Sequence, residues 1–201
     1  MGFSVTLAAV PLETRDAFLA DAGVTVTDQA DPEASEKISA AEVGEYFVVW
    51  RNLRMVPLHA EPDWPGLSQV APVHVLDVVD SAGAQMLTYY EDGEERWVIE
   101  ASDLHEDFLG ITGAPPHDID AVRQRIIDEM RTRFPNKPRD EVDELIASNS
   151  ELPSRVFNDI VGCNHEDNPL DGLYALSGDL PVLSVTGKRK DPNAKPWWKF
   201  W

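Results

Sequence analysis

Hydrophobic and polar residues alternate along several short segments in the first half of the chain. Residues 3–10 (FSVTLAAV) alternate with the period of a strand and predict one well-buried face. The same alternation, or a short apolar run, predicts further strands at residues 24–27, 46–50, 73–79, 85–90 and 96–101, and a final one at residues 180–185. The pattern therefore predicts a sheet built from at least five short strands.

A tight hairpin is predicted within residues 85–101. Asp92 and Gly93 lie between two alternating segments, and an Asp-Gly pair in that position favours a two-residue type I′ turn. Such a turn allows Trp97 and Ile99 to pair across the strands with Leu87 and Tyr89. We expect Trp97 to be largely buried.

Helical periodicity dominates the second half. Residues 118–134 form one apolar stripe predicted to face the sheet; its members are Ile119, Val122, Ile126, Ile127, Met130 and Phe134. Residues 141–147 and 153–161 predict two more helices, the second capped by Gly162. An earlier helix is expected at residues 11–21, ended by Gly23, and one helical turn at residues 67–70. Residues 28–42 are acidic and rich in small side chains, which predicts a mobile loop ending in a turn of helix.

Strands followed by helices indicate an α+β domain. We expect residues 1–186 to form a single domain with a mainly antiparallel sheet and two to four helices packed on it. Residues 187–201 (GKRKDPNAKPWWKFW) have a different composition and form a basic-aromatic C-terminal tail.

The tail opposes the charge of the rest of the chain. It has a net charge of +4, the whole chain has −19, and the other 186 residues therefore carry −23. The predicted binding residues of the tail are Lys188, Arg189, Lys190, Trp197, Trp198 and Trp201. Two interpretations stay open: the tail binds a protein partner, or it docks on its own domain or a twin subunit. We expect docking, because the tethered acidic body is the nearest negative charge.

Charge and composition also limit the classes of partner and the cellular compartment that we expect. An acidic body repels nucleic-acid phosphates and anionic bilayers, so we expect no nucleic-acid partner. No apolar run approaches the ~20 residues of a membrane span. The single cysteine, Cys163, excludes an internal disulfide and fits a reducing cytoplasm.

No segment carries a catalytic signature. Residues 163–167 (CNHED) contain a thiol and an imidazole, but no second Cys/His pair lies nearby to complete a zinc site. We interpret Cys163 as a small apolar residue under a helix end. His117, Asp118 and Asp120 stand at a helix start, where carboxylates cap free amides. The sequence therefore predicts no catalytic residue, no cofactor and no metal.

Several segments resemble a group of small soluble bacterial proteins of uncharacterised activity. The shared sequence motifs are MGFSVTLAAV, GEYFVVWRN, TYYEDGEERWVIE and the helix-turn segment SELPSRVFNDIVGCNHED. The resemblance covers roughly residues 2–167, and Cys163 stands where the group has an aromatic residue. It implies a soluble bacterial α+β protein and no mechanism.

Two functions follow as hypotheses. The first is a non-enzymatic acidic module that binds a protein partner, as immunity and inhibitor proteins do when they mask a basic surface. The alternative is an enzyme or small-ligand-binding protein whose pocket is assembled from residues dispersed in the sequence. An enclosed pocket with two or more ionisable groups of shifted pKa favours the alternative, whereas a flat or convex acidic face favours the module.

Overall fold

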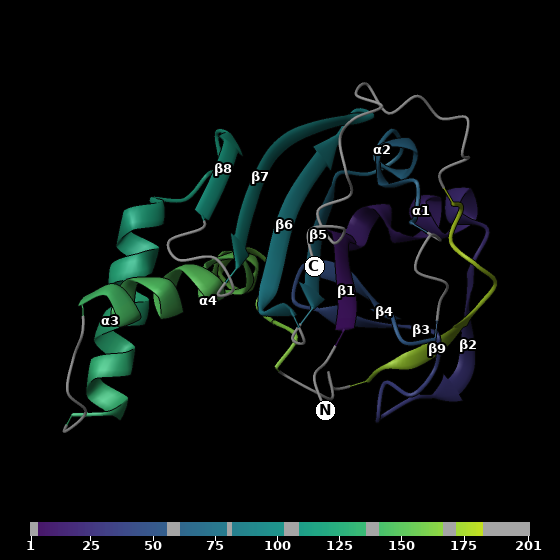
Figure 1. Cartoon of the computed structure of the whole chain (residues 1–201). Coiled ribbons are helices and arrows are strands. Elements are labelled where there is room, and N and C mark those ends of the chain that lie inside the picture. Colours follow the sequence, from purple (N-terminus) through teal and green to yellow (C-terminus); the bar gives the residue numbers. More distant parts are fainter. Residues whose placement is uncertain are drawn as a thin grey trace.

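The computed structural model describes residues 4–55, 61–79, 82–102, 109–135, 141–166 and 172–182, with only the backbone described for residues 141–146. Within these ranges the chain forms a nine-stranded antiparallel sheet and four α-helices (Figure 1). The α+β class and the antiparallel sheet predicted from the sequence are confirmed. The expected tail, residues 187–201, lies outside the described residues.

The sheet has the order β2-β9-β3-β4-β1-β5-β6-β7-β8. Its strands are β1 (Ser4–Pro11), β2 (Thr25–Ala30), β3 (Ile38–Val43), β4 (Tyr46–Asn52), β5 (Val73–Val79), β6 (Ala84–Glu91), β7 (Glu94–Ser102), β8 (Leu109–Gly113) and β9 (Tyr174–Ser177). The helices are α1 (Arg15–Ala22), α2 (Trp64–Leu67), α3 (Ile119–Arg133) and α4 (Glu141–Val161), and a 3-10 turn, η1 (Leu12–Thr14), precedes α1.

Strand β1 lies in the middle of the sheet and is buried on both faces. Leu7 and Ala9 join the core on the α4 side, whereas Ala8 and Val10 join the core beneath α1 and α2. The prediction of a single buried face was therefore wrong. The residues do alternate between the two faces of the strand, but the side chains on both faces are apolar or small enough to pack under helices.

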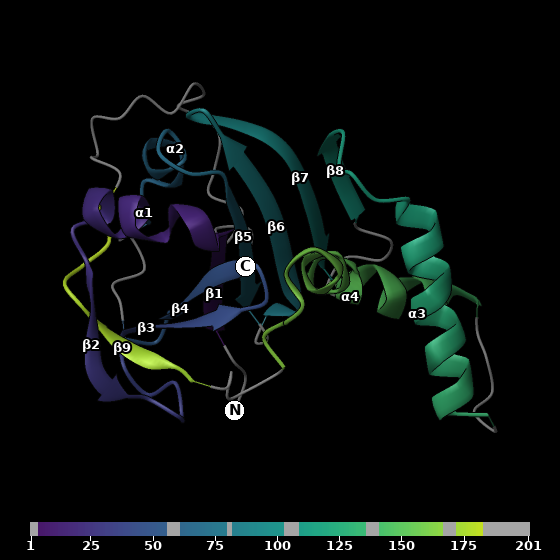
Figure 2. The same ribbon diagram turned by 180° about the vertical axis from the view of Figure 1, so that it is seen from behind.

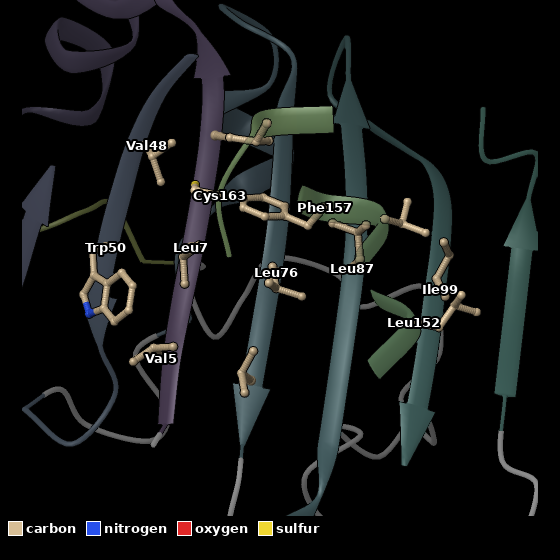
Figure 3. Close-up of a cluster of buried hydrophobic side chains, with 14 of the residues drawn as sticks. Val5, Leu7, Val48, Trp50, Leu76, Leu87, Ile99, Leu152, Phe157 and Cys163 are labelled. Carbon is tan, nitrogen blue, oxygen red and sulfur yellow. The ribbon is translucent and has the colours of Figure 1, made fainter. Parts of the chain in front are cut away.

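Figure 3 shows the core on the α4 side. Phe157 of α4 lies over Leu7, Leu76 and Leu87 of three neighbouring strands, and Leu152 of the same helix lies beside Ile99 of β7. Figures 1 and 2 show α1 and α2 together on the other side of the sheet. None of the helices in the described part of the chain has the length and apolarity required to cross a membrane.

The β6–β7 hairpin is confirmed in both its turn and its register. Asp92 and Gly93 have φ of 54° and 78°, as a type I′ turn requires. Leu87 faces Ile99 and Tyr89 faces Trp97, which is 5 % exposed. Ser68, which follows α2, fixes the turn: its carbonyl accepts the Asp92 N–H at 3.1 Å and its Oγ accepts the Gly93 N–H at 3.0 Å.

Helix α4 is continuous where the sequence predicted two helices. Pro153 lies inside it and has no N–H to donate. Gly162 follows its last residue with φ of 89°. The predicted helix at residues 11–21 corresponds to η1 and α1, ended by Gly23 with φ of 67°. The predicted turn at residues 67–70 lies slightly earlier, as α2.

Helix α3 has the predicted extent but not the predicted neighbour. Its apolar residues pack on α4, and the helix stands beyond the β8 edge of the sheet (Figures 1 and 2). Arg125 pairs with Asp159 at 2.5 Å. Phe134, predicted to lie on the buried stripe, is 48 % exposed. The apolar stripe correctly predicted a helix here. It did not predict that the helix would pack on α4 in place of the sheet.

One stretch was assigned wrongly from the sequence, and another lies partly outside the described residues. Residues 28–42 contain the end of β2 and most of β3 in place of a mobile loop. Asp31 closes the connection, because its carboxylate accepts the N–H groups of Ser35 and Glu36 and the hydroxyl of Ser39. The final strand of the described part is β9, at residues 174–177. In the predicted strand 180–185, only Val182 pairs, in an isolated bridge with Pro62, and residues 183–185 lie outside the described residues.

Candidate functional site

Four rings from four strands form a contiguous aromatic cluster on the α4 side of the sheet. The cluster consists of Tyr46 on β4, His74 on β5, Tyr89 on β6 and Trp97 on β7. The His74 ring stacks on Tyr89 with centroids 4.5 Å apart, and Tyr89 stacks on Trp97 at 5.7 Å. Tyr46 meets His74 edge-on at 6.2 Å. The strand registers place these rings side by side, since each belongs to the same face at neighbouring positions.

A second imidazole, His117, acts on this cluster from the segment that leads into α3. Burial, followed by the effect of His117, lowers the pKa of His74 to about 4. His74 is therefore neutral at pH 7. The Nδ1 atoms of His74 and His117 are both buried, and neither has a hydrogen-bond partner among the described residues. Two such atoms in one region are unusual, because buried polar groups are generally hydrogen-bonded.

A half-buried carboxyl group, that of Asp77, lies on the opposite face of the same strand. Asp77 accepts a hydrogen bond of 2.5 Å from the Thr6 hydroxyl of β1. Burial raises the pKa of Asp77 to about 6, against the Thr6 hydrogen bond, and Glu61 adds to the rise. Arg51, 7 % exposed on β4, attracts the ionised form. Asp77 and His74 thus have shifted pKa values but are separated by the sheet.

The third feature is an acidic turn, defined as Glu91, Asp92, Glu94 and Glu95 at the tip of the β6–β7 hairpin. Within the described part of the chain, Arg96 pairs with this turn and contacts Glu91, Asp92 and Glu94 at 3.5, 3.2 and 2.8 Å. The Asp92 and Glu94 side chains are 79 % and 70 % exposed. The turn touches the aromatic cluster, because the Tyr89 hydroxyl donates to Glu91 at 3.0 Å.

Two hollows on the described surface lie elsewhere. The larger, about 650 Å³, follows the exposed side of α3 between Ala121 and Arg133. The smaller, about 210 Å³, is bordered by Ser4, Glu33 and Trp50, among others. Neither hollow is lined by His74, Asp77 or a residue of the acidic turn.

The structure explains the sequence candidates that it describes. Cys163 is 2 % exposed within the core under the end of α4, as interpreted from the sequence (Figure 3). Asp118 caps α3 by accepting the Ala121 N–H at 3.1 Å. Within the described ranges, no three His, Cys, Asp or Glu side chains converge as a metal site would require. The six tail residues predicted to bind a partner lie outside the described residues.

Sequence reasoning gave no functional weight to His74 and missed Asp77. Both stand in the apolar strand VHVLDVV, and a polar residue on each face of a buried strand was the available signal. His117 was interpreted only as part of a helix start. Its approach to His74 depends on the path of β8 into α3, which the local pattern does not give.

Comparison of the chain with protein-family models, with curated proteins and with solved structures finds no match. The acidic turn offers exposed carboxylates on an anchored backbone, and the aromatic cluster offers the neutral imidazole of His74 beside stacked rings, with His117 nearby.

Proposed function

We propose that this chain is a cytoplasmic, non-enzymatic module that binds a basic protein partner through its acidic turn. The observation that carries the proposal is the anchoring of the turn. Ser68 holds the backbone of Asp92 and Gly93 through two hydrogen bonds, so the turn that carries the carboxylates is anchored to the domain. A preorganised surface loses less conformational entropy on binding than a loose one.

The charge of the molecule supports this reading. The described cations that form ion pairs do so with carboxylates of the same body; they are Arg15, Lys37, Arg96, Arg123, Arg125, Arg131 and Arg155. The formal net charge is still −19. A field of this sign steers a basic partner toward the molecule and raises the association rate.

The distribution of shifted pKa values also favours binding over catalysis. A general acid and base must both reach one substrate. His74 and Asp77 face opposite sides of the sheet, and neither lines one of the two hollows described above. An acid–base pair built from these two residues is therefore not supported.

The test is affinity capture by the tagged full chain from a bacterial lysate at 0.15 M salt, followed by binding measurements with the purified partner. The turn variant is Asp92→Asn with Glu94→Gln; asparagine tolerates the positive φ of position 92. We expect at least a tenfold weaker Kd, about 1.4 kcal/mol.

The matched control is Asp28→Asn with Glu33→Gln, which removes the same charge from exposed positions on β2 and the loop after it. The control should bind like the wild type. Equal capture by wild type, turn variant and control would reject the turn as the interface. Absence of any partner at 0.15 M salt would reject the module.

A second candidate function, binding of a small polar ligand, is favoured by the two Nδ1 atoms of His74 and His117. A ligand with a hydroxyl or amide group would satisfy both imidazoles while its apolar part packs against the rings of Tyr46 or Tyr89. Native mass spectrometry of freshly purified protein should then show a bound mass that the His74→Phe variant lacks. The same mass, or none, in both proteins would reject this candidate.

A further inference from the structure

The two faces of strands β5, β6 and β7 are covered unequally. On the α4 side, Leu76, Leu87 and Ile99 are fully buried beneath the helix. On the other side, Met86 and Glu100 are only half-buried, and so is Val98. The hydrophobic core on that side draws on β1, β3, β4, β5, β9, α1 and α2, among the described elements; on β6 it includes Tyr90, and Thr88 on the same face is buried as well. We call this surface, made of Asp77, Met86, Val98 and Glu100, the open face.

The register makes the open face one continuous strip. Asp77 pairs with Met86 across β5 and β6, and Met86 pairs with Glu100 across β6 and β7. Val98 is the next residue on the same face of β7, two positions from Glu100. Apolar side chains thus alternate with carboxyl groups along the strip.

The described chain ends beside this strip. Val182 forms an antiparallel bridge with Pro62, and the Asp63 N–H donates to the Pro181 carbonyl at 2.8 Å. Glu61, next to Pro62, acts electrostatically on Asp77 and on Tyr90, which both belong to this side of the sheet. The chain therefore leaves the described residues on the side of the open face.

The residues that follow have the length and chemistry to cover it. Residues 183–201 can extend about 60 Å at ~3.3 Å per residue, whereas β5 and β7 are about 10 Å apart. The tail brings five basic side chains and three tryptophans. Basic groups complement Glu61 and Glu100, and indoles suit the half-buried Met86 and Val98. Tethering gives the tail a local concentration in the millimolar range, which a free partner seldom reaches.

We propose that residues 187–201 bind in cis to the open face, with tail tryptophans against Met86 and Val98 and with Lys188–Lys190 beside Glu61 and Glu100. The tail is then part of the domain and not its partner-recognition element. This inference is independent of the acidic turn, which lies at the tip of the hairpin.

Met86 provides a direct readout, since peroxide oxidises a methionine sulfur in proportion to its exposure. Peptide mapping after brief peroxide treatment of the full chain gives a rate for each methionine. Met55, 53 % exposed, reports an open site, and the half-buried Met130 on α3 reports general loosening. The variants are a deletion of residues 187–201 and a full-length chain with Trp197, Trp198 and Trp201 changed to Ala. Tyr174→Ala, which removes an exposed ring elsewhere, is the control.

We expect Met86 to be oxidised at least fivefold faster in both tail variants, with Met55, Met130 and the control unchanged. If the deletion also exposes Met130, the triple tryptophan variant decides the question. An unchanged Met86 rate in that variant would overturn the proposal. A wild-type Met86 rate that rises on dilution would also overturn it, because the occupant would then be a second copy.

Discussion

The side-chain oxygen of Gln85, on β6, accepts the backbone N–H of Ser154, inside α4, at 3.1 Å. Ser154 directly follows Pro153, where the helix has no N–H and its hydrogen-bond ladder is disturbed. Gln85 of the sheet thus accepts a helix N–H at the point where the proline interrupts the hydrogen bonding of α4. The proline is tolerated because the sheet lies close enough to take part in the hydrogen bonding of α4.

Gln85→Met should destabilise the protein. The substitution keeps the length of the side chain but removes the oxygen, so the Ser154 N–H loses its acceptor at a cost of about 1–3 kcal/mol. Urea unfolding followed by circular dichroism measures the difference. Gln85→Glu retains an acceptor and should lose less. In a Pro153→Ala background the Ser154 N–H can rejoin the helix ladder, so the effect of Gln85→Met should shrink; equal effects in both backgrounds would contradict this account.

Gly93→Val should weaken the β6–β7 hairpin. A β-branched residue at φ of 78° is strained by about 1–3 kcal/mol, and its Cβ would approach the Gln69 side chain at 3.1 Å. Thermal unfolding should show a midpoint several degrees lower. Gly93→Asn is the matched control, because asparagine adopts positive φ more readily. A valine variant as stable as the wild type would argue against the type I′ turn.

His74→Phe should alter how stability depends on pH. The folded pKa of His74, about 4, lies below its ordinary value of 6.5. Its contribution is therefore present above pH 6.5 and is lost as pH falls toward 4, by up to about 3 kcal/mol. Phenylalanine retains a ring for Tyr89 and has no proton to bind. Relative to the wild type, the variant should gain stability between pH 7 and pH 4, as urea unfolding at several pH values would show.

Asp77→Asn should have the opposite pH dependence. The folded pKa of Asp77, about 6, lies above its ordinary value of 3.8. Its favourable contribution is present below pH 4 and is lost as pH rises through 6. Asparagine can still accept the Thr6 hydroxyl. The variant should be more stable than the wild type at pH 8, by up to about 3 kcal/mol, and this advantage should vanish near pH 4. A difference that does not vary with pH would contradict the raised pKa.

Chelation should leave the protein intact. Cys163 is packed in the core, and the described residues bring no three potential ligands together. Protein treated with a chelator should keep its thermal midpoint, and elemental analysis should find no stoichiometric zinc before treatment. Restoration of a lowered midpoint by added zinc would reveal a metal that this chain needs.

Local signals explain which parts of the fold could be predicted from the sequence. The hairpin of β6 and β7 was predictable because its turn residues and its alternation lie within 17 consecutive positions. Strand β3 was not, since its sequence ISAAEV has the composition of a loop. Ala40 and Ala41 are nearly fully buried there, one on each face of the sheet, so packing against both layers decided the structure.

The candidate site was harder to predict because its parts meet only through the fold. His74 and His117 are 43 positions apart, and β8 with the turn after it brings them together. Alternation along β5 was enough to place His74 and Asp77 on opposite faces. It did not indicate that the Asp77 carboxyl would lie half-buried beside Thr6 and Arg51.

Folding also changes the protonation of His74 and Asp77, the two polar residues of β5, in opposite directions. Near pH 5 the unfolded chain carries a proton on the His74 imidazole and none on the Asp77 carboxyl, and the folded chain has the reverse. The number of bound protons at this pair is almost unchanged. Between about pH 4 and pH 6 their opposing pH dependences therefore largely cancel in the intact protein. The free energy of unfolding would then vary little with pH in that range although both groups ionise. Replacing either His74 or Asp77 would make the pH dependence caused by the other residue measurable.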